Sequence, residues 1–143
     1  MRLNHITLAA SDVAASAAFY RRLGLEQIVA AYPDYARLVS PEGDTTLSLS
    51  RAGAGETGEA GATGAATEHN RASIHFEVGD VDATVAALKA RGFEFADEPV
   101  DQPYLWREAV LLDPDGRHIF IYNAGVNRLD PPWRLPRAET GDA

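Results

Sequence analysis

Two histidines occupy similar places in this sequence, each in a short run that precedes a helix-like segment. His5 lies in LNHITLAA, and His75 lies in SIHFEV. Alternate residues of a strand point to opposite faces, so His5 shares a face with Thr7, and His75 shares one with Glu77. Imidazole is a frequent metal ligand and can act as an acid or base near neutral pH. The two histidines are therefore the first candidates for chemistry.

The segments that follow the two strands have matching helix signals. Asp12 and Asp80 stand at N-cap positions, where a carboxylate accepts hydrogen bonds from the free N–H groups of the first turn. Both helices end in basic residues followed by a glycine, Gly24 or Gly92, as helix C-termini often do. Apolar residues recur at helical spacing after each cap: Val13, Ala17 and Tyr20, then Val81, Val85 and Leu88.

Each half of the chain continues with further strands. A short apolar run follows each helix, LEQIVA in the first half and FEF (93–95) in the second. The runs YARLVS and TTLSLS are joined by PEGD, and EAVLLD and HIFIY by PDG, as in β-hairpins. Each half is thus predicted to be strand–helix–strand–strand–strand, an internal repeat over residues 1–51 and 72–124.

The predicted repeat places both histidines on one kind of face. His5 lies seven residues before Asp12 and His75 five residues before Asp80, so both have the same parity relative to the caps. Both are predicted on the sheet face away from the helices, at equivalent positions of the repeat. A polar and aromatic face of this kind lies open to water or encloses a cavity.

Two segments lie outside the repeat. Residues 52–71 are rich in Gly, Ala, Thr and Glu, which predicts a flexible linker, with His69 as a solvated loop residue. The tail at 125–143 contains three prolines and is predicted to be irregular. We expect Trp133 and Leu135 to pack along the body of the protein or against a partner subunit.

Composition limits the classes of function. The 143 residues include 45% apolar side chains, enough for a hydrophobic core, and carry a formal charge of −8. That acidity argues against nucleic-acid binding, which requires a basic surface. The chain has no cysteine, which excludes disulfides and thiolate chemistry. With no expected signal peptide or membrane span, a cytoplasmic protein is predicted.

Several of these segments together resemble a known family, the vicinal oxygen chelate superfamily. They are the strand with His5, the helix SDVAASAAFYRRLGL, the unit HFEVGDVDATVAALKARG, and LLDPDGRHIFIY with its DPDG hairpin. The superfamily includes glyoxalase I, bleomycin-resistance proteins, fosfomycin-resistance enzymes and extradiol dioxygenases. The resemblance implies an α+β fold of two βαβββ modules, whose eight strands form a curled mixed sheet, or cup, with the helices outside. It also implies a homodimer.

The resemblance further implies where a metal would bind. Metal-dependent members hold a divalent ion through four strand positions, which correspond here to His5, Ser48, His75 and Phe120. Many members have Glu or His where Ser48 stands, and usually Glu where Phe120 stands. Two imidazoles alone bind a hard divalent ion weakly, because such ions prefer several oxygen ligands. Two other residues could complete a site with the histidines, although the family uses neither position: Glu77 and His118.

The sequence is compatible with two functions. The first is a protein that binds a small organic molecule in the cup with a degenerate or absent metal site, and its candidate ligand-binding residues are Ser48, Glu77, Trp106, His118, Phe120 and Tyr122. The protein's acidity would suit a cationic ligand. The second is a lyase, isomerase or dioxygenase that uses Fe, Mn, Ni or Zn held by His5 and His75. The alternative interpretation of YLWRE (104–108) is an ordinary edge strand with Arg107 and Glu108 facing water.

Overall fold

The computed structural model describes residues 1–52 and 72–136. The linker predicted at 52–71 falls outside these ranges except for residue 52, as do His69 and the end of the tail. None of the helices in the described ranges combines the length and apolar character needed to cross a membrane.

The first module follows the predicted order of elements. These are β1 (His5–Ala10), α1 (Val13–Leu23), β2 (Glu26–Ala31), β3 (Tyr35–Val39) and β4 (Thr46–Arg51). The strands form a sheet in the order β1-β4-β3-β2, in which β1 is parallel to β4 and the other pairs are antiparallel. The predicted PEGD turn joins β3 to β4.

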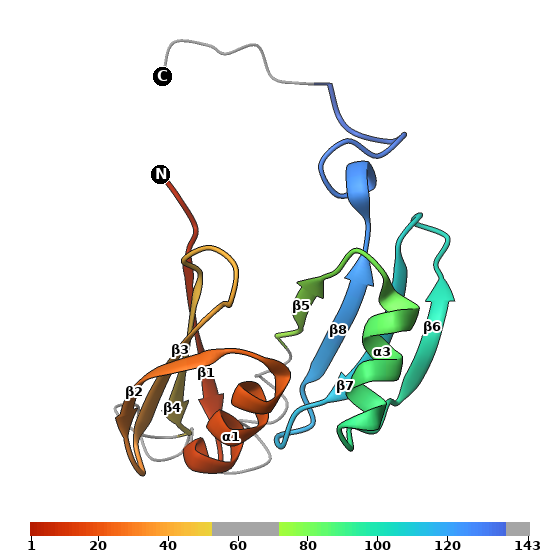
Figure 1. Ribbon diagram of the computed structural model, residues 1–143. Helices are drawn as coiled ribbons and strands as arrows, with labels where there is room; N and C mark the ends of the chain where they lie inside the picture. The colour runs from red at the N-terminus through yellow and green to blue at the C-terminus, as the bar shows by residue number, and fades with distance from the viewer. Residues whose placement is uncertain (53–71, 137–143) are drawn as a thin grey trace.

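The second module repeats this arrangement. Its elements are β5 (Ile74–Glu77), α3 (Val81–Ala90), β6 (Asp97–Asp101), β7 (Arg107–Leu112) and β8 (His118–Asn123), followed by a short 3-10 helix, η2 (Gly125–Arg128). The sheet order is β5-β8-β7-β6, and β5 is parallel to β8 just as β1 is parallel to β4. The α+β fold with paired βαβββ modules is therefore confirmed. The eight strands are divided between two four-stranded sheets, each with its own helix (Figure 1).

Two details of the second module differ from the prediction. The FEF run is not a strand, because Phe93 closes the helix: its N–H donates to the carbonyl of Leu88, and its ring is buried. The strand lies instead at β6, whose sequence DEPVD contains Pro99 and charged residues. An edge strand tolerates such residues because one of its sides needs no hydrogen-bond partner. The interpretation of YLWRE as an edge strand is also wrong, since β7 begins at Arg107 and lies between β6 and β8.

The predicted helix caps are present in both modules. The Asp12 carboxylate accepts a hydrogen bond from the Ala15 N–H at 3.0 Å, and Asp80 accepts one from Ala83 at 2.9 Å. Gly24 follows α1 with a φ of 120°, a conformation that side chains with a Cβ rarely adopt. The two helices thus begin where the sequence predicted.

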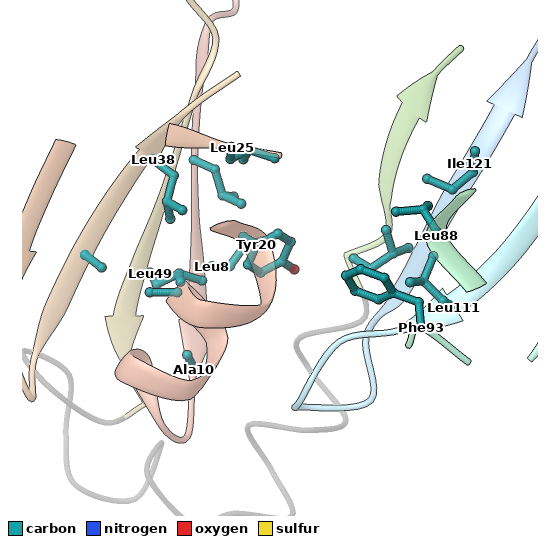
Figure 2. Close-up of a cluster of buried hydrophobic side chains, with 14 of the residues drawn as sticks. Leu8, Ala10, Tyr20, Leu25, Leu38, Leu49, Leu88, Phe93, Leu111 and Ile121 are labelled. Atoms are coloured by element: carbon teal, nitrogen blue, oxygen red, sulfur yellow. The ribbon is translucent and has the colours of Figure 1, made fainter. Parts of the chain in front are cut away.

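The hydrophobic core lies between the helices and the aliphatic faces of the sheets. Figure 2 shows side chains of this core in both modules, including Tyr20 from α1 and Leu111 from β7. The rings of Phe19 and Phe93 meet edge to face with their centres 5.7 Å apart. The core therefore continues from one module to the other.

A buried polar network also joins the modules, and we call it the junction network. The Asp113 carboxylate, at the end of β7, accepts a hydrogen bond from the Tyr20 hydroxyl at 2.8 Å. It also forms an ion pair with Arg117 at 2.5 Å. Arg117 in turn donates to the carbonyl of Ala9 in β1 at 2.7 Å. Asp113 is the first residue of the DPDG turn and Arg117 directly follows the turn, so this turn connects the second module to α1 and β1 of the first.

Candidate functional site

A hollow of about 490 Å³ lies on the face of the second sheet that faces away from α3. Its walls come from β5, β7 and β8, from the loop before β7, and from η2 and the tail beyond it. We call it the aromatic pocket, because its lining includes His75, Tyr104, Trp106, Glu108, Phe120 and Trp133.

Strand register explains how the rings of the aromatic pocket come together. β5 and β8 are parallel with His75 opposite Phe120, and the two rings stack with centres 4.3 Å apart and planes 3° apart. Trp106 and Tyr122 each meet the His75 ring edge-on, at 6.0 and 5.4 Å. Trp106 also stacks on Tyr122 at 4.9 Å. The His75 ring is thus held by three aromatic neighbours, and such pairs stabilise one another beyond their area of burial.

Glu108 is the acidic side chain that lines the aromatic pocket, which Arg128 also lines. Glu108 is only 6% exposed, and the Tyr104 hydroxyl donates a hydrogen bond to its carboxylate. Desolvation, this hydrogen bond and the charge of Glu108 together raise the pKa of Tyr104 to about 12. The phenol therefore stays protonated and remains a donor at neutral pH.

The environment also keeps His75 neutral. Partial burial lowers the pKa of His75, which remains in contact with solvent, below its ordinary value, and the negative charge of Glu108 offsets only part of this effect. A neutral imidazole stacked on Phe120 is an aromatic wall with one donor and one acceptor nitrogen.

The lowered pKa of His75 predicts a dependence of stability on pH. The His75 imidazole is protonated more readily in the unfolded chain than in the folded one. Its contribution to the free energy of unfolding is therefore complete above about pH 6.5 and is lost as the pH falls through the folded pKa. NMR titration of the His75 ring should give a midpoint below 6.5, and Glu108→Gln should lower that midpoint further. An unchanged midpoint in Glu108→Gln would show that the carboxylate does not act on the ring.

Comparison with protein-family models identifies the family. The model described as the Glyoxalase/Bleomycin resistance protein/Dioxygenase superfamily matches residues 2–119. The chain belongs to this superfamily. No individually curated protein sequence matched it.

Solved structures of the superfamily share the fold. A family enzyme from Burkholderia phytofirmans PsJN is 23% identical with a TM-score of 0.62, and the match covers 87% of this chain and 100% of that one. Lactoylglutathione lyase from Agrobacterium tumefaciens is 18% identical with a TM-score of 0.64, covering 85% and 92%. A bleomycin-binding protein complexed with bleomycin is 19% identical with a TM-score of 0.62, covering 87% and 99%. At these identities the similarity establishes the fold alone.

The four positions predicted to hold a metal are divided between the two modules. His5 contacts Thr46 at 2.6 Å and Thr7 at 3.3 Å, both in the first module. Ser48 is fully buried in β4, where its hydroxyl contacts the Tyr35 hydroxyl. Neither His5 nor Ser48 lines the aromatic pocket, which contains the other two positions.

Strand register corrects the expected equivalence of the two histidines. In the first module Thr7 lies opposite Ser48, five residues before the cap, just as His75 lies opposite Phe120 in the second. His5 lies opposite Thr46, two residues earlier. The two histidines lie on corresponding strands and on the same face, but His5 lies two residues before the position that corresponds to His75.

The donor atoms of the superfamily site do not fit a chelated divalent ion here. Within residues 1–52 and 72–136, no three His, Cys, Asp or Glu side chains come close enough to hold a metal together. The neighbour of His75 on β8 is the Phe120 ring, which has no donor atom. The assignment of His5 and His75 as ligands remains a prediction.

Three further predicted residues lie near the aromatic pocket without lining it: Glu77, His118 and Tyr122, whose ring stacks on Trp106. The Glu77 carboxylate accepts hydrogen bonds from the N–H groups of Ala124 and Gly125, at 2.8 and 3.1 Å, and so caps η2. His118 is exposed at the start of β8, with its ring centre 6.2 Å from that of Phe120. Glu77 thus positions the turn that leads into the tail.

Sequence reasoning missed several residues of the pocket, among them Glu108 and Trp133. Glu108 was expected to face water, but as part of a central strand it points into the pocket on the same side as Trp106. Trp133 was expected to pack without a defined site, and it lines the pocket while remaining 57% exposed. The period of two in WREAV already placed Glu108 with Trp106. What was missing was the central position of β7.

Proposed function

We propose that this protein binds a flat organic molecule in the aromatic pocket and does not transform it. The observation that carries the proposal is the stack of His75 on Phe120, at the position where metal-dependent members of the superfamily are expected to have a carboxylate ligand. In this chain an apolar ring replaces that donor, so the site offers packing surface in place of coordination.

The dimensions and chemistry of the pocket support binding. A volume of about 490 Å³ lies within the range typical of small-molecule sites, about 300–1,000 Å³. Rings dominate the walls, and the polar groups are few. The similarity to a structure described as a bleomycin-binding protein complexed with bleomycin adds support for sequestration of an organic ligand.

The two tryptophans of the chain provide a direct test. Both Trp106 and Trp133 line the pocket, and the sequence contains no other tryptophan. Titration with a flat heteroaromatic such as quinoline should therefore change the intrinsic fluorescence in a saturable way. Trp133→Phe should retain a saturable change, because Trp106 is then the sole reporter. A linear, non-saturating response in the parent chain would contradict the proposal.

We also propose that the protein acts as a homodimer. Several large apolar side chains near the pocket and in the tail are exposed: Leu105, Val126, Leu129, Trp133 and Leu135. Clustered exposed apolar residues often mark an interface. Light scattering should give twice the chain mass of 15.4 kDa. A monomer mass at micromolar concentration would rule this out.

A further inference from the structure

Glu108 is a buried carboxylate that lacks a basic partner. Among the described residues, the only hydrogen bond to its side chain comes from the Tyr104 hydroxyl, and no Lys, Arg or His forms an ion pair with it. Burying a charge is costly unless the charge is paired, so buried carboxylates usually have a cationic or multiple hydrogen-bonding partner. Glu108 has one neutral donor and is 6% exposed.

The basic residues nearest in sequence or space are already engaged. Arg107 precedes Glu108 on β7 and points to the opposite side, where it pairs with Asp82 at 2.8 Å and Asp101 at 3.1 Å. Arg128 lines the pocket, but its guanidinium lies 3.7 Å from the carboxylate of Glu77. The remaining titratable group of the wall, His75, is held in the stack with Phe120. Among the described residues Glu108 therefore has no ion-pair partner.

The rings beside Glu108 suit a positive charge as well. Tyr104 and Trp106 meet edge to face at 5.8 Å, and Trp106 stacks on Tyr122. The face of an aromatic ring is electron-rich and attracts cations, most strongly in tryptophan and away from water. A carboxylate framed by such faces favours a ligand that brings the missing charge and is itself flat enough to lie against the rings.

We infer that the ligand of the aromatic pocket is a planar organic cation, with a protonated or quaternary nitrogen next to Glu108 and an aromatic ring against Trp106. This inference rests on the proposed function and specifies its ligand class. The protein's formal charge of −8 would add long-range attraction for such a molecule.

Three probes of one shape separate charge from packing. They are N-methylquinolinium, quinoline and quinoline-6-carboxylate, which at pH 8 are cationic, neutral and anionic. Calorimetry should show the cation binding at least about tenfold more tightly than quinoline, with the carboxylate weakest. Equal affinity for all three would overturn the cation inference and leave the proposed function standing. No binding of any probe at millimolar concentration, with unchanged tryptophan fluorescence, would overturn both.

A matched pair of variants assigns the charge preference to one residue. Glu108→Gln keeps the shape and removes the charge, while Glu98→Gln removes the same charge from an exposed position on β6. Glu108→Gln should weaken binding of N-methylquinolinium by about 10- to 100-fold and change that of quinoline by less than about threefold. Glu98→Gln should leave both within about threefold. An equal loss of affinity for both probes in Glu108→Gln would make Glu108 a structural residue and overturn the inference. If that variant does not fold, the relative affinities of the parent chain for the three probes decide the matter.

Discussion

Replacing Asp113 with alanine is expected to lower the free energy of unfolding by about 3–5 kcal/mol, the usual result of breaking a buried ion pair from one side. The side chains of Asp113 and Arg117 are 0% and 1% exposed, so the variant would leave the guanidinium in the interior without a counter-charge. The Nε atom of Arg117 already lacks a hydrogen-bond partner in the described structure, which leaves the residue few ways to compensate. Chemical denaturation followed by circular dichroism would measure the loss.

An exposed ion pair provides the control for this variant. Asp130 lies 4.0 Å from Arg134, and both side chains are open to solvent, so Asp130→Ala should cost at most about 1 kcal/mol. Tyr20→Phe should fall between the two, at about 1–3 kcal/mol, because it removes one buried donor from Asp113 and leaves the ion pair in place. If Asp113→Ala and Asp130→Ala had similar effects, the junction network would not stabilise the chain.

The junction network gives the DPDG turn a physical role that its motif alone does not reveal. As a local pattern the turn predicted a hairpin between β7 and β8, and it was one of the segments that carried the family resemblance. In the structure the Asp113 carboxylate accepts hydrogen bonds from the backbone N–H groups of Asp115 and Arg117, each at 2.9 Å, and these bonds fix the turn locally. The same carboxylate then binds Tyr20 from α1. Local turn geometry and the packing of the two modules are therefore set by one side chain.

The sequence predicted those features that depend on neighbouring residues. The caps at Asp12 and Asp80 and the hairpin turns lie where expected, because each needs only a few residues in a characteristic order. The parity of His5 and His75 was also predictable, but their register was not, since it depends on pairing with β4 and β8. A local pattern does not specify which residue of a distant strand lies opposite.

The errors in the second module have the same origin. FEF is apolar enough for a strand, yet Phe93 is required in the core beneath α3, and the adjacent DEPVD forms the edge strand. Only the assembled sheet shows that β7 is central, and that position determines whether Glu108 faces water or the pocket. The sequence thus placed Trp106 and Phe120 at the candidate site, while the positions of Trp133 and of the buried Glu108 depended on tertiary structure.

Trp106→Ala is expected to weaken binding of N-methylquinolinium by about 30-fold or more, which corresponds to the loss of at least about 2 kcal/mol typical of a central aromatic contact. The indole is a wall of the pocket and also contacts His75, Tyr104 and Tyr122. Its removal takes away packing surface for the ligand and frees three neighbouring rings to move. Calorimetry is the appropriate measurement, because the variant loses one of its two fluorescent reporters.

Trp133 is the natural control for Trp106, since it lines the same pocket from the tail but is 57% exposed. Residues at the rim of a site contribute less than those that are desolvated at its centre, so Trp133→Ala should weaken binding by less than about fivefold. Glu108→Gln should weaken binding of the cationic probe selectively. Trp106→Ala should weaken binding of cationic and neutral probes alike, because packing against the indole does not require charge. Equal effects of the two tryptophan variants would place the ligand at the mouth of the pocket, against the tail, and not against the wall built by β5, β7 and β8.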